Sequence, residues 1–505
     1  MRGIHTSVTD IRRKVFTEVA RLAYEGGDFS RIEELPFKII PGELASYRES
    51  IFLERAIVGE RLRLSIGLPL RTISENSPIS QGIVKSAISE KYYDAPLVNI
   101  IKFACNACPD RFFVSDGCQG CLAHPCREVC PKGAISLIHG KSFIDQEKCI
   151  KCGKCKNVCQ YSAILKMERP CSKACGVDAI SSDEFGRAEI NYDKCVSCGM
   201  CIVNCPFGAI SDKGQIFQLI HAIKGGEKVY AAVAPAFVGQ FGKNITPGKL
   251  KAAMKTLGFE DVIEVATGAD LCTIEEAKDF MKKVPAEQPF MGTSCCPSWS
   301  VMAKKFFPEF EPYISMTLTP MVLTGRLIKK EHPDCKVVFI GPCCAKKLEA
   351  SRKSVRSDID FVLTFEEIMG MFEAKDIDLK KIKEEDPLAE ASASGRGFAT
   401  SGGVAQAVVD CIKITNPDVE VKTVAAQGLA DCRKMLLLAK SGKYNGYLLE
   451  GMGCPGGCVG GAGTLQPVNA ATNAINNYKK SSTKQCALED TLIINENKNE
   501  NENVL

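Results

Sequence analysis

The stretch that decides the fold is CIKCGKCKNVC, residues Cys149–Cys159, in which four cysteines are spaced C-x2-C-x2-C-x3-C. The same spacing returns in CVSCGMCIVNC at Cys195–Cys205. A shorter unit runs through both stretches: a cysteine, three residues and then Ala-Ile, with another cysteine four positions earlier. It occurs four times, as CPKGAI, CQYSAI, CGVDAI and CPFGAI, starting at Cys130, Cys159, Cys175 and Cys205. Four copies indicate two double units.

The spacing is that of the bacterial ferredoxin run, in which three thiolates hold one 4Fe–4S cube and the fourth binds the neighbouring cube. A zinc ribbon is the alternative, but its C-x2-C pairs lie well apart. Crossed ligation divides sixteen cysteines among four cubes. The predicted sets are Cys149, Cys152, Cys155 with Cys130; Cys118, Cys121, Cys126 with Cys159; Cys195, Cys198, Cys201 with Cys175; and Cys105, Cys108, Cys171 with Cys205. A mixed set with a smaller cluster stays open, and His124 is either a ligand or a loop residue beside a cluster.

Composition limits the classes of protein. The 505 residues carry a formal net charge of +4, which is too balanced to indicate nucleic acid as the main partner. The first residues lack the apolar core of a secretory signal, and no run approaches the ~18 apolar residues of a membrane helix. We therefore expect a cytoplasmic protein without a membrane partner. In that compartment thiols stay reduced, so 27 cysteines indicate metal rather than disulfides.

Four regions differ in composition, and together they predict a multidomain α+β and α/β protein. Residues 1–95 have no cysteine and the pattern of amphipathic helices. Residues 96–212 hold the tandem ferredoxin-like modules. Residues 220–470 alternate β-rich runs such as KVYAAVAPAFV with helical runs such as TIEEAKDFMKKV, an α/β pattern. The polar tail, 475–505, is expected to be disordered.

Three cysteine-bearing segments of the α/β region lie outside the ferredoxin-like pattern. They are TSCCPSW at 293–299, GPCCAKKLE at 341–349 and EGMGCPGGCVGGAG at 450–463. The third has seven glycines, which let the backbone approach a bulky group closely. A chain of cubes transfers electrons but binds no substrate, so these segments are the candidates for the chemistry that it supplies.

The three segments resemble the signature motifs of the FeFe-hydrogenase family: TSCCPxW, PCxxKxxE and ExMxCxxGC. The resemblance covers residues 96 to about 470 and implies that an FeFe-hydrogenase α/β catalytic domain follows the ferredoxin-like modules. In that family the centre is a 4Fe–4S cube joined through a cysteine sulfur to a diiron unit with CO, cyanide and a bridging dithiolate. The resemblance implies that Cys296, Cys343 and Cys454 bind the cube and that Cys458 bridges it to the diiron unit.

The resemblance also implies roles for other residues. Cys295 corresponds to the thiol that passes protons to the diiron unit, and Lys346 to a buried ammonium that donates to a cyanide. The rest of the implied proton relay is Glu276, Asp279 and Ser315, and the implied cofactor-binding residues are Met452, Pro235 and Glu349. Glu276 and Asp279 are three positions apart, on one helical face. Without the motifs, that face would be interpreted as an ordinary solvated one.

Several residues depart from the family pattern and resemble a divergent branch. Gly341 stands where the family has methionine, and Cys344 is an extra thiol beside a ligand. Asp279 replaces a glutamate, Ala462 interrupts a triple glycine, and Ala236 stands where many members have serine. The cysteines that match no motif are interpreted as small buried hydrophobic residues: Cys272, Cys335, Cys411, Cys432 and Cys486.

The implied function is a hydrogenase that interconverts protons plus electrons and H2, with ferredoxin or a similar low-potential carrier and dedicated maturation proteins as partners. One alternative is an H2-sensing homologue with slow turnover, although Cys295 is present and no signalling domain is visible. Another is a non-catalytic iron–sulfur assembly factor, which the intact Cys458 and Lys346 disfavour.

Overall fold

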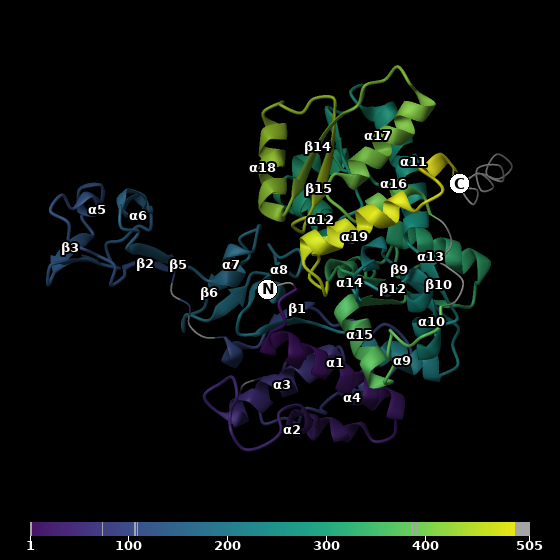
Figure 1. The fold of residues 1–505 in the computed structure, drawn as a ribbon, viewed down its shortest axis with the longest axis horizontal. Helices are drawn as coiled ribbons and strands as arrows, with labels where there is room; N and C mark the ends of the chain where they lie inside the picture. The colour runs from purple at the N-terminus through teal and green to yellow at the C-terminus, as the bar shows by residue number, and fades with distance from the viewer. Residues whose placement is uncertain are drawn as a thin grey trace.

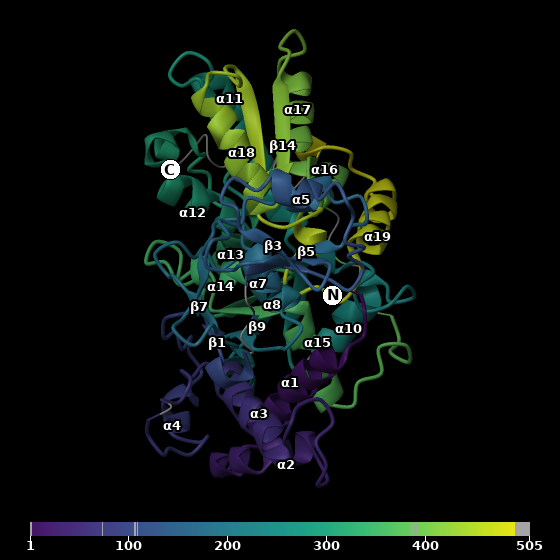
Figure 2. The ribbon, with the colours of Figure 1, turned by 90° about the vertical axis from the view of Figure 1, so that its left-hand side faces the viewer.

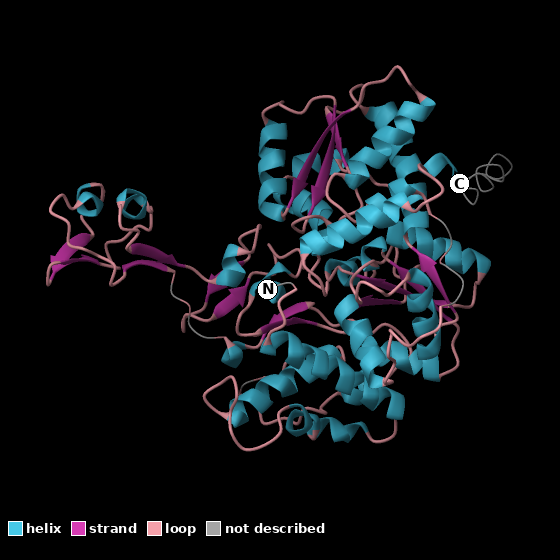
Figure 3. Cartoon of the chain, viewed as in Figure 1, coloured by secondary structure: helices cyan, strands magenta, loops and turns pink. Residues whose placement is uncertain are grey.

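The computed structural model describes residues 3–72, 74–105, 108, 110–384, 388 and 391–489. It is a body of helices and two parallel sheets, from which a small β-rich arm projects (Figures 1 and 3). All 27 cysteines are free thiols. No helix in these ranges is long and apolar enough to cross a membrane.

The first region is helical and packs directly on the α/β region. Its elements are α1 (Ser7–Glu25), η1 (Phe29–Glu33), α2 (Leu35–Ile39), α3 (Ile51–Ser65) and α4 (Ile83–Ser86). Thr6 begins α1 through a capping box, because its hydroxyl accepts from the Thr9 N–H at 3.3 Å while the Thr9 hydroxyl accepts from the Thr6 N–H at 2.8 Å. In Figure 2 these helices form the lower end of the molecule.

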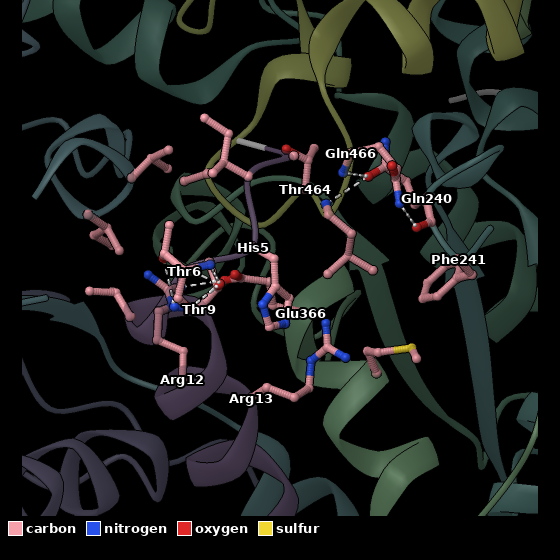
Figure 4. Close-up of a pocket in the computed structure, with 18 of the residues that line it drawn as sticks. His5, Thr6, Thr9, Arg12, Arg13, Gln240, Phe241, Glu366, Thr464 and Gln466 are labelled. Carbon is pink, nitrogen blue, oxygen red and sulfur yellow. Dashed lines mark hydrogen bonds and ion pairs between the residues drawn. The ribbon is translucent and has the colours of Figure 1, made fainter. Parts of the chain in front are cut away.

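The helical region shares one hydrophobic core with the α/β region. Val15 and Val19 of α1 are buried in the same cluster as Phe365 and Phe372 of α15 (Phe365–Ala374). Beside them, Arg12 forms a buried ion pair with Glu366, at the edge of the cavity shown in Figure 4. The predicted boundary at residue 95 therefore follows cysteine content, whereas the packing continues across it.

The cysteine-rich region consists of four two-stranded antiparallel sheets. The inner module contains β1 (Val98–Ile100) with β8 (Ile210–Asp212), β6 (Ile180–Ser182) with β7 (Ala188–Ile190), η2 (Lys102–Ala104), α7 (Pro170–Lys173) and α8 (Met200–Asn204). The outer module contains β2 (Arg111–Val114) with β5 (Ile164–Met167), β3 (Ile135–Ile138) with β4 (Lys141–Ile144), α5 (Pro125–Glu128) and α6 (Lys154–Val158). The outer module is the arm of Figure 1, and the inner module joins it to the body.

Two parallel sheets organise the α/β region. The larger has the order β10-β9-β12-β13, with bounds Asp261–Glu264, Val229–Val233, Lys336–Gly341 and Phe361–Thr364. The smaller has the order β11-β15-β14, with bounds Phe290–Gly292, Tyr447–Met452 and Lys422–Gln427. Strands β9 and β15 are almost wholly buried, as expected for parallel strands covered on both faces.

Helices and 3-10 turns cover both sheets (Figure 3). In addition to α15 they are α9 (Ile216–Lys224), η3 (Pro235–Phe237), α10 (Pro247–Leu257), α11 (Ala266–Lys283), α12 (Pro297–Phe306), η4 (Pro308–Tyr313), α13 (Pro320–Glu331), α14 (Ala345–Glu349), α16 (Ala393–Gly397), α17 (Gly403–Thr415), α18 (Leu429–Lys440), η5 (Cys458–Gly460), α19 (Val468–Lys480) and η6 (Ala487–Glu489).

The expectation of disorder from residue 475 is wrong for residues 475–489. Helix α19 continues to Lys480, and its Ile475 is fully buried in the main core. Ala487 is 1% exposed and packs with helices α11 and α17. The polar composition misled because asparagines and lysines cover the exposed face of α19 while single apolar residues anchor it. Residues 490–505 lie outside the described residues.

Candidate metal centre

The Cys-x3-Ala-Ile repeat has a direct structural meaning. In each copy the alanine N–H donates to the cysteine Sγ four positions earlier, at 3.3 Å in three copies and 3.4 Å in the copy that starts at Cys159. The residue before each alanine has a positive φ of 50–60°, which folds the chain back onto the sulfur. The alanine and isoleucine side chains are buried. The repeat therefore builds a turn that holds a sulfur near a backbone donor and anchors it in the core.

The inner module brings two sets of thiols together. Burial and, to a smaller extent, the neighbouring thiols of Cys175 and Cys195 raise the pKa of Cys198 to about 12. Burial also raises the pKa of Cys201, and Cys198, Cys195 and Cys175 contribute to that rise. In the second set, burial and, to a smaller extent, the thiols of Cys205 and Cys105 raise the pKa of Cys171 to about 12. Cys108 in turn contributes to the raised pKa of Cys105. These are two of the four sets assigned from the sequence.

Five of the eight cysteines of the outer module pack in or against a small core of Phe112, Ile135, Ile144 and Ile164: Cys126, Cys130, Cys149, Cys155 and Cys159. Burial raises the pKa of Cys155, with further contributions from Cys149 and Cys152. The Sγ of Cys118 accepts from the Ser142 N–H at 3.5 Å. His124 lies at the start of α5, and its buried Nδ1 has no hydrogen-bond partner among the described residues.

The segments of the α/β region begin where parallel strands end. Cys295 and Cys296 follow β11, Cys343 follows β12, and Cys454 follows β15. The carboxyl ends of parallel strands are the usual ligand-binding edge of such sheets. Burial and, to a smaller extent, the thiols of Cys296 and Cys343 raise the pKa of Cys458 to about 12, so three distant segments meet here. Cys454 packs against the same inner-module core as Cys198 and Cys201.

Trp299, the single tryptophan, locks two of these segments together. It is fully buried, and its indole N–H donates to the Thr293 carbonyl at 3.0 Å. A Cβ at Gly451 would lie 2.1 Å from the indole ring, so only glycine allows β15 to approach it. The tryptophan of the first segment and the glycine of the third are therefore complementary in shape.

Lys346 points toward the cysteine cluster from α14. Its ammonium donates to Glu349 at 2.7 Å, to the Thr319 hydroxyl at 3.1 Å and to the Cys295 carbonyl at 3.3 Å. Burial is the largest single influence and lowers the pKa of Lys346, but the raising effects of Glu349 and the nearby thiols together outweigh it. The net pKa lies above the ordinary value and the side chain stays charged. Cys343 and Cys295 add to this effect. Lys346 is thus a buried cation beside the candidate ligands.

Three of the predicted proton-carrying residues, Cys295, Glu276 and Ser315, lie together, whereas Asp279 lies apart from them. Burial raises the pKa of Cys295 well above its ordinary value, and Glu276 is the next largest cause. The Glu276 carboxylate accepts from the Ser294 N–H at 2.8 Å and the Ser294 hydroxyl at 3.0 Å. Ser315 is close enough to lower the pKa of Glu276. Asp279 lies further along α11 at the partly exposed surface and pairs with Lys283 at 2.8 Å.

The other predicted cofactor-binding residues lie on different sides of this site. Met452 ends β15 and is buried against Cys295 and Cys296. Pro235 follows β9 in the buried turn η3. Glu349 contacts Lys346.

Three ranges of the chain match two known protein families. Residues 227–462 match the family described as iron only hydrogenase large subunit, C-terminal domain, and residues 143–165 and 188–211 match the 4Fe-4S binding domain. The chain is 30% identical over 451 residues to Iron hydrogenase 1 of Clostridium pasteurianum, covering 77% of this chain and 76% of that protein. The chain belongs to the iron-only hydrogenase family.

Two further comparisons give lower identities. The chain is 27% identical over 272 residues to the cytosolic Fe-S cluster assembly factor narfl of Danio rerio, covering 43% of this chain and 66% of that protein. A solved structure of the FeFe-hydrogenase HydA1 from Chlamydomonas reinhardtii aligns at 24% identity with a TM-score of 0.46, covering 55% of this chain and 90% of that one. Relatives of the chain therefore include proteins named as hydrogenases and proteins named as assembly factors.

The residues present fit the iron–sulfur centre of the hydrogenase family. The thiols of Cys296, Cys343 and Cys458 have raised pKa values, so they hold their protons when no metal is bound. A metal that binds them displaces these protons, because thiols bind metals as thiolates. Glu276 Oε2 and Thr293 Oγ1 are buried there without a hydrogen-bond partner among the described residues. A Cβ at Gly461 would lie 2.4 Å from the Pro342 carbonyl, so the third segment closes tightly over the second. Within the described ranges, no three His, Cys, Asp or Glu side chains are placed to hold a single metal ion.

Two thiols without a predicted role lie at this site. Cys272 of α11 is fully buried in the cluster that contains Met452, and it adds to the raised pKa of Cys295. Its position one helical turn before Glu276 was the available signal. Cys344 is 1% exposed, and its Cβ would lie 3.2 Å from a Cβ at Gly199, next to Cys198. Cys344 therefore fills the contact between the catalytic region and the inner module.

We expect the Glu276 carboxyl to hold a proton below about pH 7 and to lose it above, because burial raises its pKa to about 7. Infrared difference spectra between low and high pH should show a protonated carboxyl band that disappears with a midpoint near 7. Because the folded pKa exceeds the ordinary value of about 4.3, the stabilising contribution of the protonated form is present at low pH and lost as the pH rises through about 7. Glu276→Gln should remove the band, and Glu275→Gln, at the neighbouring exposed position, should leave it. A band unaffected by Glu276→Gln would contradict the assignment.

Proposed function

We propose that this protein is a hydrogenase that interconverts protons plus electrons and H2. The observation that carries the proposal is the placement of Cys295 and Glu276 on one side of the Cys296–Cys343–Cys458 cluster, with the ammonium of Lys346 beside it. One cluster of ligands is thereby supplied with a buried proton carrier and a buried cation. An assembly factor that only carries iron–sulfur clusters has no evident use for that combination.

In the proposed centre, Cys296, Cys343, Cys454 and Cys458 would hold a 4Fe–4S cube and a diiron unit with CO, cyanide and a bridging dithiolate. When bound, this group supplies the metal at which protons and electrons combine. Lys346 keeps its charge because Glu349 holds the ammonium at 2.7 Å, and that charge stabilises an anionic ligand in a buried site. Met452 and Pro235 line the site with apolar surface and exclude water.

Protons reach the centre through side chains of this chain. Asp279 and Lys283 lie at the partly exposed end of the proposed path. Glu276 then exchanges a proton near neutral pH, because its pKa is about 7. Ser294 and Ser315 orient its carboxylate, and the Cys295 thiol is the last carrier before the metal. The raised pKa of Cys295 keeps it protonated until a proton is withdrawn.

The adjacent cysteines give a sharp test of this proposal. Cys295→Ala should retain the full iron content and the CO and cyanide infrared bands, because no metal bond is lost. Its H2 production from reduced dye should fall by about 10²–10⁴, the usual contribution of a general acid–base group. Cys296→Ala should instead lower the iron content and weaken the same bands. Iron content, infrared spectra and turnover are measured on the same matured samples.

A fully loaded and fully active Cys295→Ala protein would refute the proton-carrier role. A wild-type protein with the infrared bands but very slow turnover would favour the H2-sensing alternative. A wild-type protein that lacks the bands after exposure to hydrogenase maturation proteins would favour the assembly-factor alternative, the function named for the relative from Danio rerio.

We further propose that the sixteen cysteines of residues 96–212 hold four accessory 4Fe–4S cubes that supply electrons to the centre. Cys198 contributes to this route, because its thiol is raised in pKa by Cys343 of the catalytic region as well as by its own set. Protein made without maturation factors should contain about twenty irons, four in each of five cubes. Iron analysis with Mössbauer spectra measures this, and the spectrum of an accessory 2Fe–2S cluster would overturn the partition.

The arm is the proposed docking site for ferredoxin or a similar acidic low-potential carrier in the cytoplasm. Cys152 is exposed there beside Lys154 and Lys156, which are also exposed. Lys154→Glu with Lys156→Glu should raise the KM for ferredoxin and weaken its salt dependence, since exposed charges act within about 8–10 Å. Dye-linked turnover should stay unchanged. Lys413→Glu with Lys422→Glu, two exposed lysines on the body, changes the net charge equally and serves as the control. Equal effects of the two pairs would exclude docking on the arm.

A further inference from the structure

Arg61 of α3 is a buried cation without a carboxylate partner. The residue is only 4% exposed, and the described residues place no Asp or Glu oxygen in an ion pair with it. Burying an arginine is costly unless an opposite charge or a full set of acceptors compensates it. Burial and, to a smaller extent, the like charge of Arg12 lower the pKa of Arg61 to about 10. The compensating negative charge must therefore come from another kind of group.

The Arg61 guanidinium is directed at a cysteine-bearing turn. Its Nη2 donates to the carbonyl of Gly208, three residues after Cys205. A Cβ at Gly208 would lie 2.7 Å from this nitrogen, so a glycine is required both for the approach and for the positive φ of 60°. Gly208 belongs to the turn in which the Ala209 N–H donates to Cys205 Sγ at 3.3 Å. Arg61 therefore stands directly behind one of the turns that present sulfur.

Arg48 of the same helical region binds backbone carbonyls next to the same set of thiols. Its Nη2 donates to the Ala104 carbonyl at 2.7 Å and to the Phe207 carbonyl at 3.0 Å. These carbonyls adjoin Cys105 and the turn after Cys205, two segments far apart in sequence. The loop of Arg48 is itself held by Glu54, which accepts from the backbone N–H groups of residues 46–48 at 2.6–2.8 Å. The helical region thus clamps the two segments together.

The charged groups around Arg61 leave its charge largely uncompensated. The Glu366 carboxylate is engaged by Arg12 and raises the pKa of Arg61 less than the Cys205 thiol or the Tyr47 hydroxyl does. Cys205, whose turn accepts the Arg61 hydrogen bond through the Gly208 carbonyl, is the nearby group that most favours the charged guanidinium. An anionic group on Cys205 is the counter-charge best placed for Arg61.

We propose that Arg61 is the buried counter-charge of the cluster held by Cys105, Cys108, Cys171 and Cys205, and that it raises the reduction potential of that cluster. This inference rests on the proposed partition of the accessory clusters. A nearby positive charge favours the state that has gained an electron, and net charge and burial are among the factors that set cluster potentials. It also gives residues 3–86 a role, which is to hold and charge-compensate one cluster of the chain.

The position of this cluster determines where a raised reduction potential would hold an electron. Cys171 also raises the pKa of Cys201. The set that contains Cys171 and Cys205 therefore lies next to the other set of the inner module, which contains Cys175 and Cys201. The latter set in turn neighbours Cys343. A raised potential here would hold an electron in the inner module, close to the catalytic region, rather than in the arm.

The test uses the full-length protein with its accessory clusters, made without the diiron unit, and follows each cluster by EPR during a redox titration. Arg61→Gln removes the charge but keeps an N–H donor for the Gly208 carbonyl. Arg61→Lys keeps the charge. Arg63→Gln is the matched control, because Arg63 lies on the same helix, is also 4% exposed and donates only to the carbonyls of Pro69, Ile79 and Gln81.

We expect Arg61→Gln to shift the midpoint of one cluster to a more negative potential, while Arg61→Lys and Arg63→Gln leave all midpoints near their wild-type values. Loss of one cluster in Arg61→Gln alone would also support the counter-charge role. Intact clusters with unmoved midpoints in Arg61→Gln, or equal cluster loss in all three variants, would overturn it. A wild-type protein with fewer than four accessory cubes would refute the partition instead, so the two failures are distinguishable.

Discussion

The meeting of strand ends from two parallel sheets is the constraint on which the catalytic region depends. Strands β11 and β15 pair directly in one sheet, and β12 lies at the centre of the other. Because parallel strands deliver their following loops to the same edge, Cys296, Cys343 and Cys458 meet although about 160 residues separate the first from the last. The buried indole of Trp299 against Gly451 keeps the first and third segments in register. A shift of either strand would separate the thiols.

Two buried lysines form ion pairs in different parts of this cysteine-rich interior. Lys346 and Lys347 are neighbours on the short helix α14, but their ammonium groups point to different places. Lys346 donates to the Cys295 carbonyl, whereas Lys347 is 1% exposed and pairs with Asp212 at 2.8 Å and Glu367 at 2.9 Å. The two ion pairs of Lys347 join Asp212, at the end of β8 in the inner module, to Glu367 of α15 in the main core. Buried ion pairs of this kind favour one arrangement strongly, because breaking them leaves an uncompensated charge.

Small residues let the inner module approach the catalytic region closely. A Cβ at Gly199 would lie 2.6 Å from the Cβ of Ala462 and 3.2 Å from that of Cys344. Gly199 adjoins Cys198, Ala462 follows Cys458 by four positions, and Cys344 adjoins Cys343. The departures of this chain from its family's motifs, Cys344 and Ala462, therefore lie where the two sets of thiols come nearest. Larger side chains there would lengthen the path between them.

Much of this molecule could be predicted from local pattern. The Cys-x3-Ala-Ile repeat is a turn whose hydrogen bond closes within five residues, so spacing alone reveals it. The α/β alternation and the motif residues of the catalytic region are equally local, and they led to the family. The disorder expected from residue 475 failed because Ile475 and Ala487 are held by partners distant in sequence.

Only the tertiary structure decided which charges and thiols meet. Cys272 had the pattern of an ordinary apolar helix position, and packing placed it beside Cys295. Arg61 was one arginine in an amphipathic helix, and its lack of a carboxylate partner became visible only when α3 was seen against the turn after Cys205. The physical reason is that sulfur turns and strand ends are encoded by residues a few positions apart. The compensation of a buried charge depends on every group within a few ångströms, whichever part of the chain supplies it.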